Sequence, residues 1–414
     1  MDSASLTLGD GVSALRGERP TSVEELQDLV RRCASESTPI YPQGGRTSLD
    51  YGGVPRSPGV AVSLAGLDRV IDYPAADMTI TVEAGITLGE LSAILDREGQ
   101  RLTIDAPRCG EATLGGVYAT NSTGPRRYGC GRPRDQIIGV GFVDVKGDRL
   151  KGGGRVVKNV AGYDFPRMMT GSMGTLGVIT DMTLKVRPKP EASTLVWASV
   201  TDIDRVATLL DELNLSATRP TAIELLNRPA AEEIASGIDV PKSSDWVIVL
   251  GFEDNAASVE WQVRTALEEF VGLEATRPPA EAVDRLWSAL VEYRGRDGIG
   301  FSFEAHLPPM HTAAFAAEVP PALWSLQSHA GTGIVRGVYR LDLDIDDARA
   351  EIHRLRSLAV GFGGGMVLPH CPSAWKADLE VWGYRRPDWV WCERLKQTFD
   401  PGGLLNPGRF VGKI

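Results

Sequence analysis

The sequence of 414 residues has few cysteines and no long apolar run. Its five cysteines are odd in number and widely scattered, and no pair has the CxxC spacing that is typical of zinc or iron–sulfur ligands. We therefore expect reduced thiols, and we expect any iron–sulfur cluster in an electron path to belong to another polypeptide. No apolar stretch approaches the ~20 residues of a membrane-spanning helix, and the first residues do not resemble a secretory signal. A cytoplasmic protein is expected, with peripheral docking on the inner face of a membrane left open.

Histidine is scarce too. There are five, His306, His311, His329, His353 and His370. A metal ion needs several imidazoles or carboxylates that converge, so we expect single scattered histidines to be structural and predict no metal site. His370, which lies between a run of three glycines and Cys371-Pro372, is the candidate among them for contact with a substrate.

Positive charge is in the minority, because the net charge is −10. This balance argues against non-specific binding of nucleic acid. Residues 101–190 nevertheless contain 15 Lys or Arg and 7 Asp or Glu, so the rest of the chain carries a net charge of −18. A basic segment in an acidic protein suits an anionic ligand, although a solvated surface of mixed charge explains it as well.

The chain is long enough for two domains. In the first part, capping boxes at residues 22–25 and 87–90 predict helices between short strands. Beyond Pro190 glycine thins out, and the alternation of strands and helices predicts an antiparallel sheet with helices on one face. We expect domains at 1–191 and 192–385, and a C-terminal helix and tail at 386–414 that return to the first domain.

Glycine-rich segments carry the signals for a ligand. Residues 42–48, PQGGRTS, follow a predicted strand, and adjacent glycines can turn successive N–H groups toward a diphosphate. A plain tight turn is the alternative. Residues 107–135 form a long irregular segment, which is usually functional in a compact domain, although a mobile surface loop fits as well.

Two further segments complete the set. Residues 152–180 combine glycines that enter a strand with Lys158 and Arg167, which could meet a carboxylate or form structural salt bridges. Residues 399–409 contain two turn-forming sequences around Leu404-Leu405, and this predicts a tail that docks on another part of the molecule.

In this order and spacing, the four segments resemble the FAD-linked oxidase family with its vanillyl-alcohol-oxidase-type (PCMH-type) FAD-binding domain. More narrowly, residues 124–127, 158–164 and 406–409 are similar to the smaller flavin-binding subunits of bacterial glycolate oxidases. The similarity covers residues 20–190 and the last 20 residues, and the segment between them matches in general texture only. The resemblance implies an α+β fold, with a two-subdomain FAD-binding domain and an α+β cap domain over the flavin ring.

The resemblance also implies which residues contact FAD. Residues 43–47 would hold the diphosphate, the segment from Pro107 to Asn121 would line the ribityl chain and the ring, and residues 174–179 would lie beside the adenosine. Asn406 would return near the flavin ring. The full set implied is Pro42, Gln43, Gly44, Gly45, Arg46, Thr47, Ser48, Pro107, Thr113, Gly115, Gly116, Ala119, Asn121, Gly124, Gly174, Thr175, Gly177, Val178, Ile179 and Asn406. No catalytic residue is assigned, and His370, Lys158 and Arg167 are the candidates.

Two departures from the family bear on function. Many members attach FAD through a His or Cys near the diphosphate loop, but none lies between Cys33 and Cys109, so non-covalent FAD is expected. The His-rich metal motif of the larger subunits is missing as well. The resemblance implies the FAD-binding subunit of a complex that oxidises glycolate or another 2-hydroxy acid, with a larger flavin subunit and an iron–sulfur subunit as partners. A flavin-holding subunit without its own active site and a stand-alone FAD-dependent oxidoreductase remain the alternatives.

Overall fold

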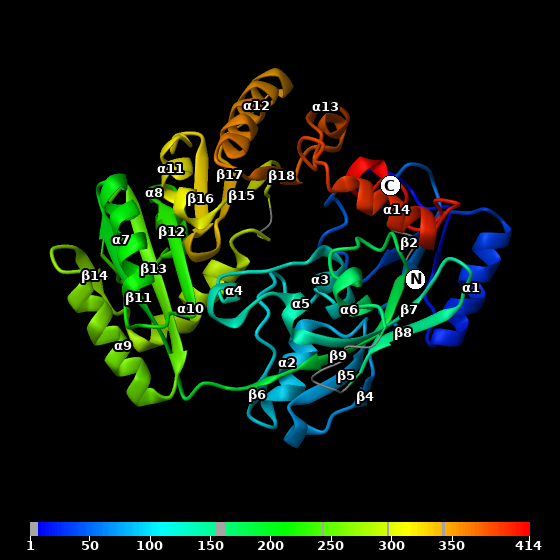
Figure 1. The fold of residues 1–414 in the computed structure, drawn as a ribbon, viewed down its shortest axis with the longest axis horizontal. Helices are drawn as coiled ribbons and strands as arrows, with labels where there is room; N and C mark the ends of the chain where they lie inside the picture. The colour runs from blue at the N-terminus through cyan, green and yellow to red at the C-terminus, as the bar shows by residue number, and fades with distance from the viewer. Residues whose placement is uncertain (1–6, 155–161, 242–243, 296–297, 342–343) are drawn as a thin grey trace.

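The computed structural model describes residues 7–154, 162–241, 244–295, 298–341 and 344–414, and its architecture is α+β, as predicted (Figure 1). The first sheet is parallel, with strands in the order β1 (Arg16–Glu18), β3 (Val60–Ser63) and β2 (Ile40–Gln43). Helix α1 (Val23–Ser35) covers it, and its apolar positions Val23, Leu26, Leu29 and Val30 are buried. The Ser22 side chain accepts a hydrogen bond from the Glu25 N–H and starts the helix.

The second sheet is antiparallel and runs β4 (Val70–Asp72), β5 (Thr79–Glu83), β9 (Val178–Lys185), β7 (Ile137–Val143), β8 (Arg149–Gly153). Its core is completed by α2 (Leu88–Asp96), which has the predicted capping box, and by α3 (Leu114–Thr120). The short elements around this sheet are α4 (Arg127–Cys130), α5 (Pro133–Gln136), α6 (Phe165–Met169) and the strand pair β6 (Gln100–Arg101) and β10 (Arg187–Pro188).

The third sheet is antiparallel throughout, as the alternation of strands and helices predicts. Its strands run in the order β14 (Glu274–Thr276), β11 (Ala192–Val200), β13 (Trp246–Asp254), β12 (Ala222–Asn227), β16 (Trp324–His329), β17 (Ile334–Tyr339), β15 (Ser302–His306) and β18 (Gly365–His370). The prediction that helices cover one face is wrong, because they cover both. Successive residues of β11 point to opposite faces of the sheet, and they are apolar on both faces. Each face is therefore covered by helices.

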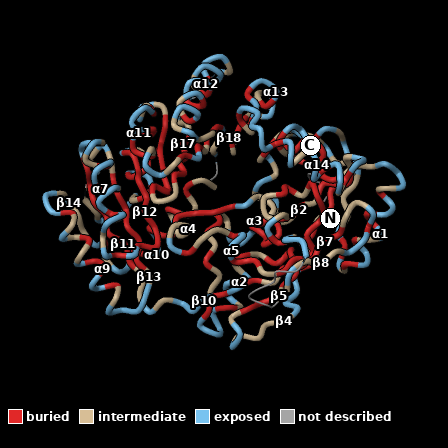
Figure 2. Tube along the Cα trace, in the orientation of Figure 1, coloured by how far each residue is buried: buried red, intermediate tan, exposed pale blue. Residues whose placement is uncertain are grey.

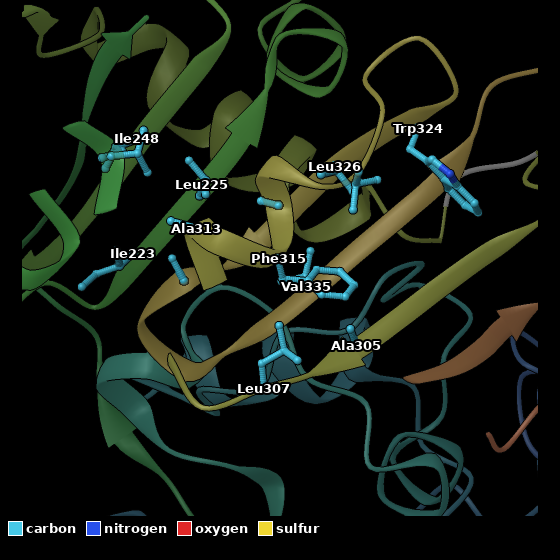
Figure 3. Packing of buried hydrophobic residues seen from close by; sticks show 14 of the residues in the cluster. Ile223, Leu225, Ile248, Ala305, Leu307, Ala313, Phe315, Trp324, Leu326 and Val335 are labelled. Carbon is cyan, nitrogen blue, oxygen red and sulfur yellow. The ribbon is translucent and has the colours of Figure 1, made fainter. Parts of the chain in front are cut away.

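Different helices pack on the two faces of the third sheet. One face packs against α7 (Ile203–Leu215), α9 (Ala256–Glu269), α11 (Thr312–Ala317) and α12 (Ile345–Gly361), and Figure 3 shows part of that core. The other packs against α8 (Arg228–Ile234) and α10 (Ala280–Glu292). Buried residues follow the strands of this sheet closely (Figure 2). No helix in the described ranges is both long and apolar enough to cross a membrane.

The C-terminal segment lies against the first sheet. It contains α14 (Trp389–Phe399) and the tail, and Figure 1 places α14 near β2. The short helix α13 (Lys376–Leu379) precedes α14 and contributes Leu379 to the core of the third sheet. The Ile40 N–H donates to the Leu404 carbonyl at 2.7 Å, and the Asn406 N–H donates to the Ile40 carbonyl at 2.8 Å. The tail therefore forms an isolated parallel bridge between Leu405 and Ile40 of β2, and this pairing brings Asn406 next to the loop that follows β2.

Candidate functional site

A cavity of about 780 Å³ is lined from both halves of the chain. One side consists of residues 41–51, helix α3 with its flanking loops, four residues between Met173 and Ile179 (Met173, Gly174, Gly177 and Ile179), and Asn406. The other consists of residues 293–295, 298–299 and 302–304, His306, strand β17 and the end of β18. A volume of this size lies within the range of cofactor and substrate pockets.

Most of the residues that sequence analysis assigned to a cofactor line this cavity. They are Pro42, Gln43, Gly44, Gly45, Arg46, Thr47, Ser48, Pro107, Thr113, Gly115, Gly116, Ala119, Asn121, Gly174, Gly177, Ile179 and Asn406. They come from four separate stretches of sequence, and the fold brings these stretches to one wall.

Three residues of the predicted set lie elsewhere. Val178 alternates with Gly177 and Ile179 along the chain, so its side chain points away from the cavity into the core beneath α1. Thr175 is buried, and its hydroxyl donates to the Ser172 carbonyl at 2.7 Å. Gly124 packs against another residue, since a Cβ there would lie 2.4 Å from Cβ of Asp105.

The candidates for a catalytic residue also differ in whether they line the cavity. His370 lines the cavity. Arg167 does not: its side chain is 60% exposed and pairs with Asp164 at 3.4 Å. Lys158 lies outside the described residues.

Gly44 and Gly45, in the loop after β2, allow this loop to pack closely against residues 111–113. Gly44 lies where a Cβ would be 1.9 Å from Oγ1 of Thr113, and Gly45 where a Cβ would be 1.6 Å from the Glu111 carbonyl oxygen. The positive φ of this turn falls instead on Arg46, at 63°. The two cavity-lining loops can therefore touch only because these positions lack side chains.

A ladder of buried polar groups crosses four adjacent strands of the third sheet. Nδ1 of His329 lies 2.6 Å from Oε1 of Glu224, and Nη1 of Arg336 donates to Nε2 of the same histidine. Nε of Arg336 donates to Oε2 of Glu304 at 2.6 Å. Burial and the nearby Arg336 guanidinium lower the pKa of His329 well below its usual value, so this ring is neutral. Its Nδ1–H then donates to Glu224.

Two guanidinium groups at the same end of the cavity have no carboxylate partner among the described residues. Arg294 donates to Oγ of Ser122, and Nη1 of Arg127 lies 3.5 Å from Oγ1 of Thr123. Burial and the neighbouring Arg336 lower the pKa of Arg294 to about 10. With this lowered pKa Arg294 is still charged near neutral pH. A bound anion would offset the cost of burying this charge beside another guanidinium group.

His370 is held as a neutral hydrogen-bond donor. Burial, with a smaller contribution from Arg294, lowers its pKa to about 4. Ser302 Oγ accepts the main-chain N–H of His370 at 3.1 Å and lies 2.9 Å from Nδ1, so the hydroxyl proton is available to Nδ1. The ring proton then resides on Nε2.

The lowered pKa of His370 predicts acid sensitivity. In the unfolded chain its pKa is about 6.5. Since the unfolded state binds the proton and the folded state does not, its stabilisation is complete above about pH 6.5 and is lost as the pH falls toward about 4. We expect His370→Gln to flatten the fall in unfolding free energy between about pH 7.5 and pH 5, by up to about 1.4 kcal/mol per pH unit. Urea denaturation measures this, and the exposed His353→Gln should keep the wild-type slope.

Two buried cations fix the loop that carries Tyr51 to the cavity. Arg409 donates to the carbonyls of Leu49, Tyr51 and Gly53 and to Asp10. Lys376 donates to the carbonyls of residues 50 and 52 and also pairs with Asp10. Five consecutive carbonyl groups of this loop are thus held by the side chains of Arg409 and Lys376.

Sequence reasoning missed the charged wall of the cavity. Glu304 and His306 stand on a strand whose intervening residues, Phe303 and Ala305, are buried and apolar. Charged residues that alternate with core residues are a signal for a polar face within a sheet. Arg294 gave no such signal, because it follows a helix in an irregular segment.

Two family models match the chain. The FAD binding domain matches residues 18–153, and the C-terminal domain of FAD linked oxidases matches residues 189–410. Fold and cavity thus define an FAD-dependent oxidoreductase. The chain belongs to the FAD linked oxidases.

Relatives and solved structures agree with this assignment. Glycolate oxidase subunit GlcE of Escherichia coli (strain K12) is 28% identical, over 94% of this chain and 98% of the relative. Glycolate oxidase subunit GlcD of Bacillus subtilis (strain 168) is 25% identical over 95% and 88%, and a D-2-hydroxyglutarate dehydrogenase of Xanthomonas citri pv. viticola is 27% identical over 94% and 88%. Substrate-bound p-cresol methylhydroxylase shares the fold, with a TM-score of 0.71 at 17% identity over 95% of this chain and 88% of that one.

Proposed function

We propose that this protein oxidises a small 2-hydroxy acid, such as glycolate, with non-covalent FAD, and that it works as one subunit of a complex. The observation that carries the substrate class is a pair of guanidinium groups, Arg294 and Arg127, at one end of the cavity, neither of which has a carboxylate partner among the described residues. An Arg fork is well suited to bind a carboxylate with two hydrogen bonds. The names of the relatives support the same class, since they include glycolate oxidase subunits and a D-2-hydroxyglutarate dehydrogenase.

The cavity fits FAD. Its first wall is built of small residues and main chain, which allow a flat ring and an extended diphosphate to lie close, and Gly174 and Asn406 stand where a ring edge could meet them. We assign residues 43–48 to the diphosphate and Thr113, Gly116 and Ala119 to the ribityl chain. When bound, FAD supplies the acceptor for a hydride. We also propose that residues 1–191 with 386–414 form the FAD-binding unit and residues 192–385 the cap.

The second wall then acts on the substrate. Arg294, together with Arg127 from the other side of the cavity, would hold its carboxylate, and the Nε2–H of His370 would donate to an oxygen of the substrate. The Tyr51 ring, whose loop is fixed by Arg409 and Lys376, closes this end of the cavity. Charged and polar groups that are held in place before the substrate arrives need little reorganisation during reaction.

The test is reduction of the bound flavin. The purified, flavin-loaded protein is mixed without oxygen with glycolate, D-lactate or D-2-hydroxyglutarate, and the visible absorbance of oxidised flavin is followed. We expect at least one of these acids to bleach the flavin, and bleaching by none of them contradicts the proposal. Bleaching only after a larger flavin subunit is added would favour the alternative, a flavin-holding subunit without its own active site.

Partner proteins follow from the same proposal. The E. coli and B. subtilis relatives are named as subunits, so we propose a larger flavin subunit and an iron–sulfur subunit as partners that take up the electrons. Tagged protein purified from its own cells should carry both. Recovery as a lone chain that is reoxidised by a soluble acceptor would favour a stand-alone oxidoreductase.

The non-covalent attachment of FAD gives a separate prediction. No histidine or cysteine is among the residues of the first wall, so we expect no bond between the protein and the flavin. Acid precipitation should leave all of the yellow colour in the supernatant, as absorbance of the two fractions would show. Colour that stays with the pellet contradicts the prediction.

A further inference from the structure

A turn at residues 7–13 lines the cavity, although it lies outside both matched family models. The model of the FAD binding domain begins at residue 18, whereas residues 7–11 are part of the cavity wall. The turn is closed by its own main chain, because the Leu8 N–H donates to the Val12 carbonyl at 2.8 Å. This segment, the Asp10 turn, has no role in the function proposed so far.

The Asp10 turn is bonded to both ends of the loop that we assign to the diphosphate, residues 43–48. At the start of this loop, Nε2 of Gln43 donates to the Thr7 carbonyl at 2.8 Å. Just beyond its end, Oδ1 of Asp50 accepts the main-chain N–H of Asp10 at 2.7 Å. Turn and loop both line the cavity, so a cofactor that lies along the loop also lies beside the turn.

Close packing fixes the position of the Asp10 turn on this loop. A Cβ at Gly9 would lie 2.4 Å from the Leu49 carbonyl oxygen, so a residue with a side chain does not fit there without movement of the turn. The Leu8 side chain is buried and packs with Tyr41 and Ala61 in a small apolar cluster. The turn is therefore anchored in the core on one side and lies against the loop on the other.

Asp10 holds the turn in a strained conformation. Its φ is 55°, and such a left-handed conformation at a residue with a side chain persists only where the surroundings hold it, as at ligand clamps. Its side chain is fully buried, and Nζ of Lys376 and Nη1 of Arg409 each lie 2.6 Å from one of the carboxylate oxygens. The Ser373 hydroxyl donates to the same carboxylate at 2.9 Å. Release of the turn would therefore break a buried network of charges.

We propose that the Asp10 turn is a further part of the FAD site, which contacts the bound dinucleotide through its main chain and must move before FAD can leave. This assignment rests on the proposed placement of the diphosphate at residues 43–48. A segment that is already fixed before the cofactor binds adds contacts at little cost in conformational entropy. Its main effect is on the dissociation rate of FAD, because differences in affinity between related complexes lie mostly in that rate.

The first test needs neither turnover nor a variant. Amide hydrogen exchange of the whole protein is measured with and without bound FAD, by mass spectrometry of peptic peptides. We expect the peptides that contain residues 7–13 and residues 43–50 both to exchange about tenfold more slowly, or slower still, when FAD is bound. Slower exchange at 43–50 with unchanged exchange at 7–13 overturns the inference. Unchanged exchange at both segments removes the proposed placement of the diphosphate, and the inference with it.

The second test moves the turn without removing a charge. Gly9→Ala places a methyl group against the Leu49 carbonyl, and we expect FAD to dissociate about tenfold faster or more, as the rise of flavin fluorescence after dilution of the loaded protein would show. Gly272→Ala is the matched control, since its φ of 86° is equally strained but a Cβ there meets nothing within 4 Å, away from the cavity. Its rate should stay within about twofold of the wild type. The same small change in Gly9→Ala overturns the inference, and the exchange experiment decides it if that variant does not fold.

Discussion

Replacing Arg294 with methionine is expected to weaken substrate binding by about 100-fold, because truncating one partner of a buried charge pair costs about 2–5 kcal/mol. The guanidinium is buried, is charged near neutral pH and has no carboxylate partner among the described residues, so a substrate carboxylate would be its counter-ion. Methionine keeps much of the volume and removes the charge. The Kd follows from the dependence of flavin reduction on substrate concentration, and flavin content should stay unchanged.

Matched variants sharpen this result. Arg167→Met removes an exposed guanidinium that pairs with Asp164, and it should leave Kd unchanged. Arg294→Lys keeps the charge but not the fork, so an intermediate Kd is expected. A Kd within about twofold of the wild type in Arg294→Met would show that the carboxylate is bound elsewhere, with Arg127 as the next group to replace.

Replacing Arg409 with methionine is expected to lower the free energy of unfolding by about 3–5 kcal/mol, the cost of breaking a buried ion pair by removing one partner. Nη1 donates to Asp10 and to the Gly53 carbonyl, each at 2.6 Å, and Nη2 donates to Tyr51 at 2.9 Å. Without the guanidinium, Asp10 keeps Lys376, but carbonyls of the cavity loop lose their donor. Bound FAD should be lost more readily as well, since this loop lines the cavity.

Urea denaturation followed by tryptophan fluorescence measures the first effect, and titration with FAD followed by flavin fluorescence measures the second. The control is Arg264→Met, which removes an exposed arginine on α9 and should change neither quantity. Stability and FAD affinity like those of the control would mean that Lys376 alone holds the loop.

Local sequence signals predicted much of the first half of the fold. Ser22 and Thr87 start helices because their side chains satisfy the first free N–H groups, and this chemistry depends on neighbours three residues away. The helices on the second face of the third sheet were not predicted. A helix has the same amphipathic pattern whichever face of the sheet it packs on, so the pattern does not tell the two faces apart.

The sequence by itself determined the glycine-rich wall of the cavity and the family of the protein. Where two segments of main chain pack closely together, a side chain does not fit, so glycine at such positions can be recognised in the sequence alone. Val178 and Thr175, which the sequence analysis assigned to the cofactor, do not line the cavity, because the direction of each side chain depends on how the chain packs in three dimensions. Only the tertiary structure decided the charged wall. Arg294 meets Ser122 from 172 residues away, and Arg336 meets Thr123 from 213 residues away. Such contacts, and the pKa values that they set, depend on distance in space, and no local pattern in the chain encodes that distance.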